Sequence, residues 1–172
     1  MVQEAEFAVT SRVGNIEIRR YRPMVLATVK GYSDDDAFSL LFGYISGRNR
    51  TSKRIAMTAP VITSEKIPMT VPVVSGSGSF SFVLPAGMTL DSAPVPTDER
   101  VVLEATPERS VAVIRFRGRA RRRDIVTVAE ELRVTLERSN RRSKGEPFLM
   151  RYNPPFTPGF LRRNEVGVDV ED

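Results

Sequence analysis

MTAPVITSEKIPMTVPV, residues 57–73, contains the pattern Met-Thr-x-Pro-Val twice, at Met57–Val61 and at Met69–Val73. Successive side chains of a β-strand point to opposite faces of the sheet, and the odd-numbered positions of both copies are all apolar. Thr63–Lys66, between the copies, is typical of a turn. We therefore expect a β-hairpin whose two arms bury the same face.

The prolines of this stretch all fall at even-numbered positions, on the face opposite the apolar residues. A proline has no backbone N–H and cannot donate a hydrogen bond to a neighbouring strand. This property confines the two predicted strands to a sheet edge, a bulge or a barrel corner.

Short segments with β-type composition continue on both sides of this stretch, and two helices are expected between them. Ser33 and the three aspartates after it are typical of a helix start, so the first helix should reach about Ile45 and end at Gly47. Apolar residues at helical spacing predict a second helix over about Arg122–Arg138. The expected strands are Ile16–Arg22, Met24–Gly31, Phe80–Pro85, Val101–Ala105, Val111–Gly118, Phe148–Tyr152 and Val166–Val170.

The order strand, strand, helix, strands occurs twice, which indicates a weak internal repeat with halves at about 16–85 and 100–172. The chain length of 172 residues suits a single domain, 1–172. Many short strands are buried most simply in an antiparallel sheet that closes or nearly closes on itself, with the helices packed on it. We therefore expect an α+β fold.

The amino-acid composition excludes several kinds of catalytic and metal-binding site. The chain has no His and no Cys, which excludes His-activated nucleophiles, zinc sites built on these residues, disulfides and the commonest protein ligand of haem iron. No pair of carboxylates demands acid–base catalysis, and we identify no catalytic residue and no metal site. No apolar run is long enough to span a bilayer and no secretory signal is visible, so we expect a cytoplasmic location.

The first predicted helix carries more apolar surface than packing on a sheet requires. With residues about 100° apart, its apolar arc covers roughly 200°, from Leu40 round to Phe42. One packed face needs an arc of about 100° or a little more. Either Leu40 or Phe42 lines a cleft for an apolar guest, or a neighbouring loop covers them.

Six arginines lie within the nine residues 115–123, and the net charge of the chain is +5. Arg115, Arg117 and Arg119 alternate along a predicted strand and its end, so they share one face. That face has no interleaved aromatic side chains on which bases would stack. We favour a solvated basic face over a rim for an anionic ligand, and we expect no nucleic acid partner.

The segment RYNPPFTPGFLRRNEV, residues 151–166, combines prolines, aromatics and charges. Its prolines make a stiff loop, which can hold a binding edge at low entropic cost. The same loop can instead act as a clasp that closes the barrel, with Arg163 and Glu165 in a fixed polar network.

Six motifs carry a resemblance to a known family. They are Tyr21–Pro23, Tyr44–Asn49, Lys53–Val61, Met69–Val73, Ser81–Pro85 and residues 151–166. Over about Ile16–Val170 the chain resembles the SOUL haem-binding protein family. The resemblance implies a distorted antiparallel β-barrel with two flanking helices and a pseudo-twofold repeat of two halves, similar to the effector-binding domains of certain bacterial regulators. It also implies non-catalytic binding of haem or a related tetrapyrrole, a flat apolar anion.

The resemblance further implies a ligand groove beside the first helix, with an apolar wall from that helix and basic side chains after it that meet the propionates. Haem in this groove would have no His as axial ligand, which leaves Tyr44, Met57, Met69 or no ligand at all. The implied binding residues are Phe38, Leu41, Phe42, Ile45, Arg48, Lys53, Arg54, Met57 and Met69.

Two other functions stay open beside the binding of a small molecule. A His-free hydrolase or isomerase would use Tyr152 and Glu165 in a groove between the halves, and a desolvated Glu165 facing Tyr152 would favour it. A protein-interaction module would use the exposed face of the first helix, or the basic face, to bind a protein or a membrane.

Overall fold

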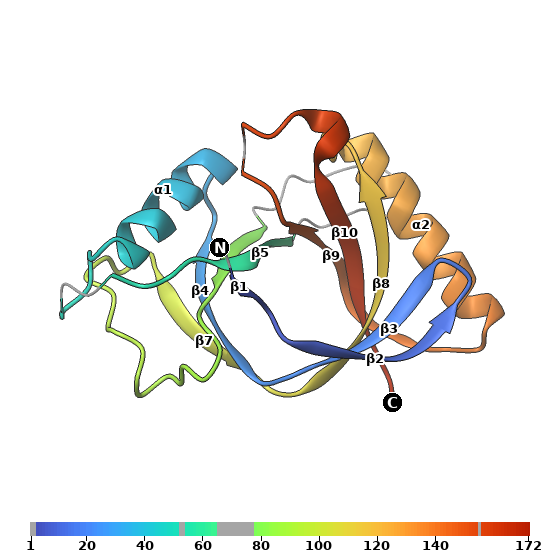
Figure 1. The fold of residues 1–172 in the computed structure, drawn as a ribbon, viewed down its shortest axis with the longest axis horizontal. Helices are drawn as coiled ribbons and strands as arrows, with labels where there is room; N and C mark the ends of the chain where they lie inside the picture. The colour runs from blue at the N-terminus through green and yellow to red at the C-terminus, as the bar shows by residue number, and fades with distance from the viewer. Residues whose placement is uncertain (1–2, 52–53, 65–77, 155) are drawn as a thin grey trace.

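The structure is a computed structural model that describes residues 3–51, 54–64, 78–154 and 156–172 (Figure 1). In chain order its elements are β1 (Gln3–Glu4), β2 (Phe7–Val13), β3 (Ile16–Tyr21), β4 (Met24–Lys30), α1 (Asp34–Ile45), β5 (Thr58–Ser64), β6 (Ser79–Val83), β7 (Val102–Thr106), β8 (Arg109–Arg117), α2 (Arg122–Arg138), β9 (Ser143–Arg151), η1 (Gly159–Leu161) and β10 (Arg163–Val170).

The strands form one open sheet in the order β2-β3-β8-β10-β9-β5-β6-β4-β7, and β1 pairs with β5 beside this path. Neighbours on the path are antiparallel, whereas β1 and β5 are parallel. The α+β class with an antiparallel sheet and two helices is therefore confirmed. The predicted barrel is wrong, because no pairing among the described residues joins β2 to β7. β2 is partly exposed along its length, with Thr10 and Arg12 among its exposed side chains, as expected at the edge of a sheet. The repeat of two halves stays a prediction.

β5 explains how a strand with a proline fits inside this sheet. It pairs with β6 on one side and, on the other, with β1 at Thr58 and Ala59 and with β9 from Val61 onward. The register with β6 shifts between Thr58 and Val61, so Pro60 lies in an irregularity, as predicted from its missing N–H. The predicted turn at Thr63–Lys66 begins too early, because β5 continues to Ser64. The second Met-Thr-x-Pro-Val copy lies outside the described residues.

Both helices have the predicted bounds. The side chain of Ser33 caps α1 by accepting a hydrogen bond from the backbone N–H of Asp36 at 3.2 Å. The buried residues of α1 pack on β4 and β6, against side chains such as Ala27 and Phe82. α2 buries one face against β8, β9 and β10; this face consists of Ile125, Ala129, Leu132 and Leu136.

Both helices cover the same face of the sheet. Thr63 of β5 lies opposite Leu149 of β9, which packs under α2, while Val61, two residues from Thr63, packs under α1. Residues directly opposite one another in neighbouring strands share a face. The helices therefore lie at the two ends of one outer face (Figure 1).

The opposite face, called the inner face below, has its own cluster of buried side chains: Tyr21, Val111, Val113, Phe148 and Met150. No helix covers this cluster among the described residues. The N-terminal segment, residues 3–7, runs across it instead (Figure 1), and Ala5 and Phe7 pack against it. The backbone N–H of Ala5 donates to the carbonyl of Ala59 at 2.8 Å, which holds the segment on β5.

The core under α2 gives a test of the packing. Leu132 is fully buried there, whereas Val126, on the same helix, is exposed. Leu132→Ala should lower the free energy of unfolding by about 2–5 kcal/mol, because it removes buried methyl groups and leaves a cavity. Val126→Ala should change it by less than about 0.5 kcal/mol. Urea unfolding followed by circular dichroism measures both, and equal effects would contradict the packing described.

Candidate functional site

The predicted apolar wall on α1 divides into buried and exposed members. Leu41 and Ile45 are buried between α1 and the sheet, Phe38 is half-buried, and Phe42 is 51% exposed. The rings of Phe38 and Phe42 stack with centroids 6.0 Å apart and 12° between their planes. Phe38 also meets Phe82 edge-on at 5.4 Å. α1 therefore presents an aromatic pair to solvent, and this pair is anchored on the core through Phe82.

Two of the predicted basic residues follow α1. Arg48 and Arg54 are both exposed, and neither makes an ion pair within the described part of the chain. The side chain of Arg48 folds back over Gly43, where an added Cβ would lie 3.0 Å from Arg48 Cδ. A guanidinium group is thus held next to the helix turn that carries Phe42.

The predicted iron ligands are less accessible. The hydroxyl of Tyr44 is buried and donates to the carbonyl of Pro94 at 2.6 Å, and burial raises the pKa of Tyr44 to about 12. Met57 is half-buried against the core under α1. The other two predicted binding residues, Lys53 and Met69, lie outside the described residues. Of the predicted iron ligands that the structure describes, Tyr44 therefore already uses its hydroxyl group in a hydrogen bond to Pro94.

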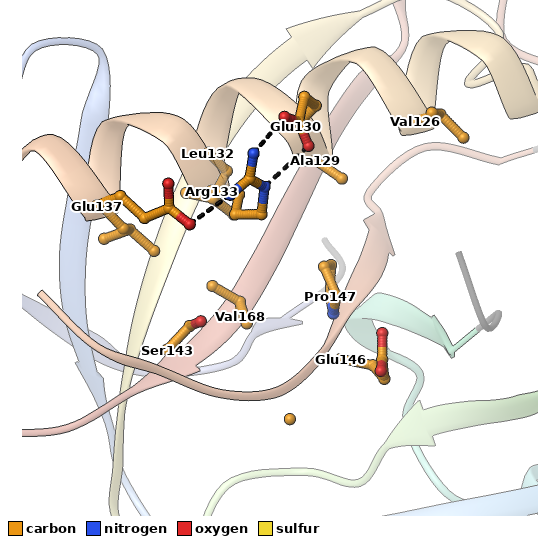
Figure 2. A pocket seen from close by; sticks show the side chains of 12 residues that line it. Val126, Ala129, Glu130, Leu132, Arg133, Glu137, Ser143, Glu146, Pro147 and Val168 are labelled. Carbon is orange, nitrogen blue, oxygen red and sulfur yellow. Dashed lines mark hydrogen bonds and ion pairs between the residues drawn. The ribbon is translucent and has the colours of Figure 1, made fainter. Parts of the chain in front are cut away.

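A pocket that the sequence did not indicate lies between α2 and β9 (Figure 2), with a volume of about 420 Å³. Its floor is apolar and consists of Ala129, Leu132, Leu136, Pro147 and Val168. Its rim carries Glu130, Glu137 and Glu146, and Arg133 lies between the first two. Arg133 donates to Glu130 at 2.6 Å and also to Glu137.

The charges at this rim decide what the pocket can hold. Three carboxylates against one guanidinium leave a negative rim, and a ligand with two propionates would meet charge of its own sign there. The pocket suits an apolar or cationic guest better than haem. Sequence reasoning missed it because β9 begins at Ser143, whereas the pattern predicted a strand only from Phe148.

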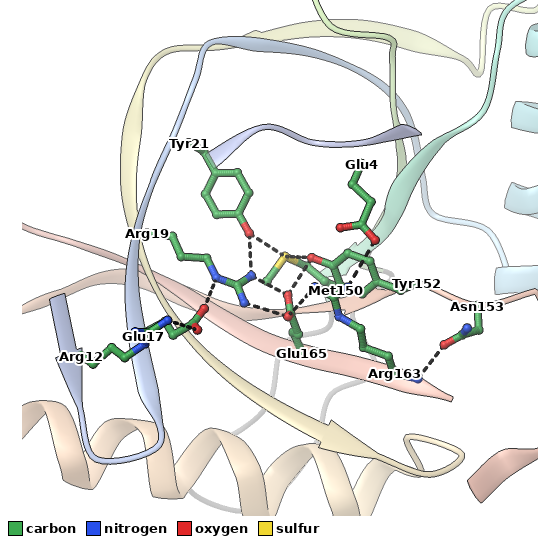
Figure 3. A network of polar contacts seen from close by, with 10 residues as sticks. All are labelled: Glu4, Arg12, Glu17, Arg19, Tyr21, Met150, Tyr152, Asn153, Arg163 and Glu165. Carbon is green, nitrogen blue, oxygen red and sulfur yellow. Dashed lines mark hydrogen bonds and ion pairs between the residues drawn. The ribbon is translucent and has the colours of Figure 1, made fainter. Parts of the chain in front are cut away.

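A buried ion pair lies on the inner face (Figure 3). Glu165 of β10 is 0% exposed and accepts hydrogen bonds from Arg19 of β3, from Nη1 at 2.7 Å and from Nη2 at 2.9 Å. The hydroxyl of Tyr152 donates to Glu165 Oε2 at 2.6 Å, and Arg163 Nη2 donates to Oε1 at 3.1 Å. Donors from three places in the chain therefore occupy both carboxylate oxygens.

The N-terminal segment completes this network. The guanidinium of Arg19 lies 4.2 Å from the centre of the Phe7 ring, and its Nε donates to Glu17 at 2.8 Å. Glu4 pairs with Arg163 at 3.2 Å (Figure 3). The segment therefore contributes an aromatic surface to one arginine and a counter-charge to the other.

The pKa values follow from these contacts. Burial by itself raises the pKa of Glu165, but the hydrogen bonds from Arg19 and Tyr152 and the charges of the arginines outweigh it, so the pKa lies below its ordinary value. Burial, together with Tyr21 and Glu165, raises the pKa of Tyr152. At neutral pH Glu165 is an anion and Tyr152 is a neutral donor.

The structure brings Tyr152 and Glu165 into contact, as the hydrolase hypothesis required, but the roles that it gives them are different. A carboxylate bound by two guanidinium groups is a weak base, and a tyrosine with a raised pKa is a poor nucleophile. The predicted polar network of Arg163 and Glu165 is confirmed. Enzymatic activity stays a hypothesis for which this network supplies no free base.

The arginine run also has the predicted arrangement. Arg115 and Arg117 of β8 are exposed on one face, while Phe116 between them packs under α2, and Arg119, beyond the end of β8, is exposed as well. In the part of the chain that the structure describes, neither helix is long and apolar enough to cross a bilayer.

Comparison with known proteins identifies the family. The model of the family described as SOUL heme-binding protein matches residues 2–169. Heme-binding protein 1 of Mus musculus is 30% identical over 137 residues, which is 76% of this chain and 68% of that protein. Heme-binding protein 1 of Sus scrofa is 28% identical over 136 residues, with the same shares covered. The chain belongs to the SOUL heme-binding protein family.

Solved structures share the fold at low identity. The C-terminal domain of EcmrR superposes with a TM-score of 0.66 at 9% identity, over 91% of this chain and 97% of that domain. A hydrolase from Listeria innocua superposes with a TM-score of 0.63 at 12% identity, over 94% of each chain. At these identities the likeness concerns the fold alone.

The ion pair on the inner face gives a pH-dependent prediction. Glu165→Gln leaves Arg19 buried without its main counter-charge and should lower the free energy of unfolding at pH 7 by about 3–5 kcal/mol. The lowered pKa of Glu165 stabilises the fold above the ordinary pKa of about 4.3, and this contribution is lost as the pH falls through the folded pKa. The difference between wild type and variant in urea unfolding should therefore start to shrink below about pH 4 and disappear once the pH is below the folded pKa.

Glu130→Gln is the matched control, because Glu130 also pairs with an arginine but is exposed. Exposed ion pairs contribute little to stability, so this variant should unfold at nearly the same urea concentration as the wild type. A gap between wild type and Glu165→Gln that stays constant from pH 7 into the acid range would show that the lost stability is not electrostatic.

Proposed function

We propose that this SOUL-family protein binds haem or a related flat, anionic tetrapyrrole on the exposed side of α1. The observation that supports this place is the stacked pair of Phe38 and Phe42, which leaves Phe42 exposed, with the side chain of Arg48 over the next residue of the helix, Gly43. Membership of the family supports the class of ligand, and the aromatic pair supports its position.

A tetrapyrrole matches this surface in shape and charge. Its flat ring would cover Phe42 and remove apolar surface from water, and offset stacking would add about 0.5–1.5 kcal/mol. Its propionates would reach Arg48 and Arg54, which supply charge-assisted hydrogen bonds. Asp34, at the other end of α1, already pairs with Arg151 at 3.1 Å, which offsets its repulsion of an anion.

The buried members of the predicted site have a supporting role in this proposal. Leu41 and Ile45 hold α1 on the sheet and fix the direction of Phe38 and Phe42. Lys53 and Met69 remain predicted members, one as a further cation and the other as an adaptable apolar neighbour.

Haem would add a ligand-binding, redox-active iron to the protein. The described residues favour recognition of the ring and the carboxylates over ligation of the metal, because the Tyr44 hydroxyl is bound to Pro94 and Met57 is half-buried. A tetrapyrrole without iron should therefore bind as well as haem.

Titration with two ligands tests this proposal. Haemin, followed by its Soret band, and protoporphyrin IX, followed by its fluorescence, should both saturate the protein at micromolar concentrations with dissociation constants of the same order. Saturation by haemin alone would show that the iron is ligated and would contradict recognition through the ring. If neither ligand saturates the protein, the proposed function is wrong.

Variants on α1 test the position. Phe42→Ser removes the exposed ring and should weaken binding of both ligands by about tenfold or more, given the transfer free energy of a Phe side chain. Phe160→Ser is the matched control and should bind normally, because the exposed Phe160 belongs to η1, which contacts β8. If Val126→Ser weakens binding while Phe42→Ser does not, the ligand lies in the pocket beside α2.

A further inference from the structure

The loop between β9 and β10 exposes three large apolar side chains within six residues. Phe156 is 87% exposed, Phe160 is 73% exposed and Leu161 is 55% exposed. The last two belong to η1. Large apolar side chains that gather on a surface mark interaction sites, whereas single ones need no explanation.

Two hydrogen bonds link described residues of this loop. Arg162 Nε donates to the carbonyl of Thr157 at 2.8 Å, inside the loop. At its base, the backbone N–H of Arg163 donates to the side chain of Asn153 at 2.6 Å. These bonds restrain the chain between Thr157 and Arg163, which carries Phe160 and Leu161, and so reduce the ordering that binding through them requires.

Basic residues lie beside the η1 end of the same loop. Arg119 lies against η1, since a Cβ added to Gly159 would be 2.8 Å from Arg119 Cγ, and Arg117 lies opposite Arg163 in the sheet. Arg121–Arg123 open α2, whose first turn is beside η1 (Figure 1). A helix start also carries partial positive charge. The apolar tip is thus bordered by positive charge.

Little of this charge is neutralised inside the protein. Arg117, Arg119 and Arg122 are exposed and make no ion pair with any residue that the structure describes. The neighbouring acid, Asp124, is 3.9 Å from Arg123 and accepts a hydrogen bond from the backbone N–H of Arg121. The surface therefore complements an anionic partner.

We propose that this tip, formed by Phe156, Phe160, Leu161 and the arginines beside them, docks on the surface of an anionic lipid bilayer. The apolar side chains would enter the boundary between headgroups and acyl chains, while the arginines bind headgroup phosphates. Peripheral membrane binding combines these two contributions, an apolar insertion and attraction to negative lipid.

The same observations disfavour nucleic acid as the partner. Non-specific binding of a single strand uses a positively charged groove with aromatic rings along it, on which bases stack. Here the apolar side chains protrude from a loop, and one of them, Leu161, offers no ring. A lipid surface accepts aromatic and aliphatic side chains equally.

A single tryptophan reports on the tip, because the natural chain contains none. The emission of a Phe156→Trp protein should shift to the blue with vesicles of equal parts phosphatidylcholine and phosphatidylserine, but not with phosphatidylcholine alone. Leu90→Trp, at an exposed apolar residue elsewhere, should show no shift. The proposal is overturned if Phe156→Trp does not respond to anionic vesicles or if Leu90→Trp responds equally.

Co-sedimentation of the protein with the same vesicles separates the two contributions. Phe156→Ser with Phe160→Ser should reduce partitioning more than about tenfold, and Arg117→Gln with Arg122→Gln should reduce it about fivefold per charge. Arg138→Gln with Arg142→Gln makes the same change of charge at the opposite end of α2 and should retain binding. If both double arginine variants lost the same amount of membrane partitioning, binding would depend on net charge alone, and the proposed docking surface would be wrong.

Tighter binding to a single-stranded oligonucleotide than to anionic vesicles would also overturn the proposal. The tip lies outside the proposed tetrapyrrole surface, so its variants should titrate normally with haemin. Failure of one proposal therefore does not count against the other.

Discussion

A single open sheet has two faces to cover, and in this protein both helices lie on the same one. The other face would be left with Tyr21, Phe148 and Met150 in water. The N-terminal segment crosses the inner face and packs Ala5 and Phe7 against these side chains, which shields them from water. Most of the remaining organisation, including the place of the buried charges, follows from the need to close that face without a helix.

The polar network on the inner face adds specificity to this closure. β8 lies between β3 and β10, so Arg19 has to reach across a whole strand to meet Glu165, and it passes over valine side chains of β8. A bidentate arginine–carboxylate contact requires one relative position of its two partners. The net contribution of such a pair to stability is small, because desolvation offsets much of the attraction.

Ala5 and Phe7 cover the buried cluster of the inner face, and two exposed surfaces of the protein suit partners. One is the aromatic pair on α1, with arginines at the end of the helix. The other is the apolar tip beside the start of α2, with arginines around it. Each surface combines exposed rings with positive charge, but the two suit different partners. The stacked rings on α1 suit a flat ligand, whereas the protruding loop suits a lipid surface.

The sequence by itself determined the local structure. Capping at Ser33 and the spacing of the apolar residues give both helices their observed bounds, and the missing N–H of Pro60 predicts an irregularity in β5. These features depend on neighbours in the chain, so they can be read from neighbours in the sequence. The motifs were long enough to indicate the family as well.

Only the tertiary structure decided which strands meet and what covers each face. The barrel expectation failed at β2 and β7, because strand pairing depends on contacts between distant segments that no local pattern encodes. The same limit applies to the candidate site. Apolar periodicity placed Leu41 and Phe42 on one helix, but only packing against β4 and β6 buried the first and left the second exposed. Glu165 met Arg19 for the same reason, since the two residues are 146 positions apart in the sequence and come together only through the sheet.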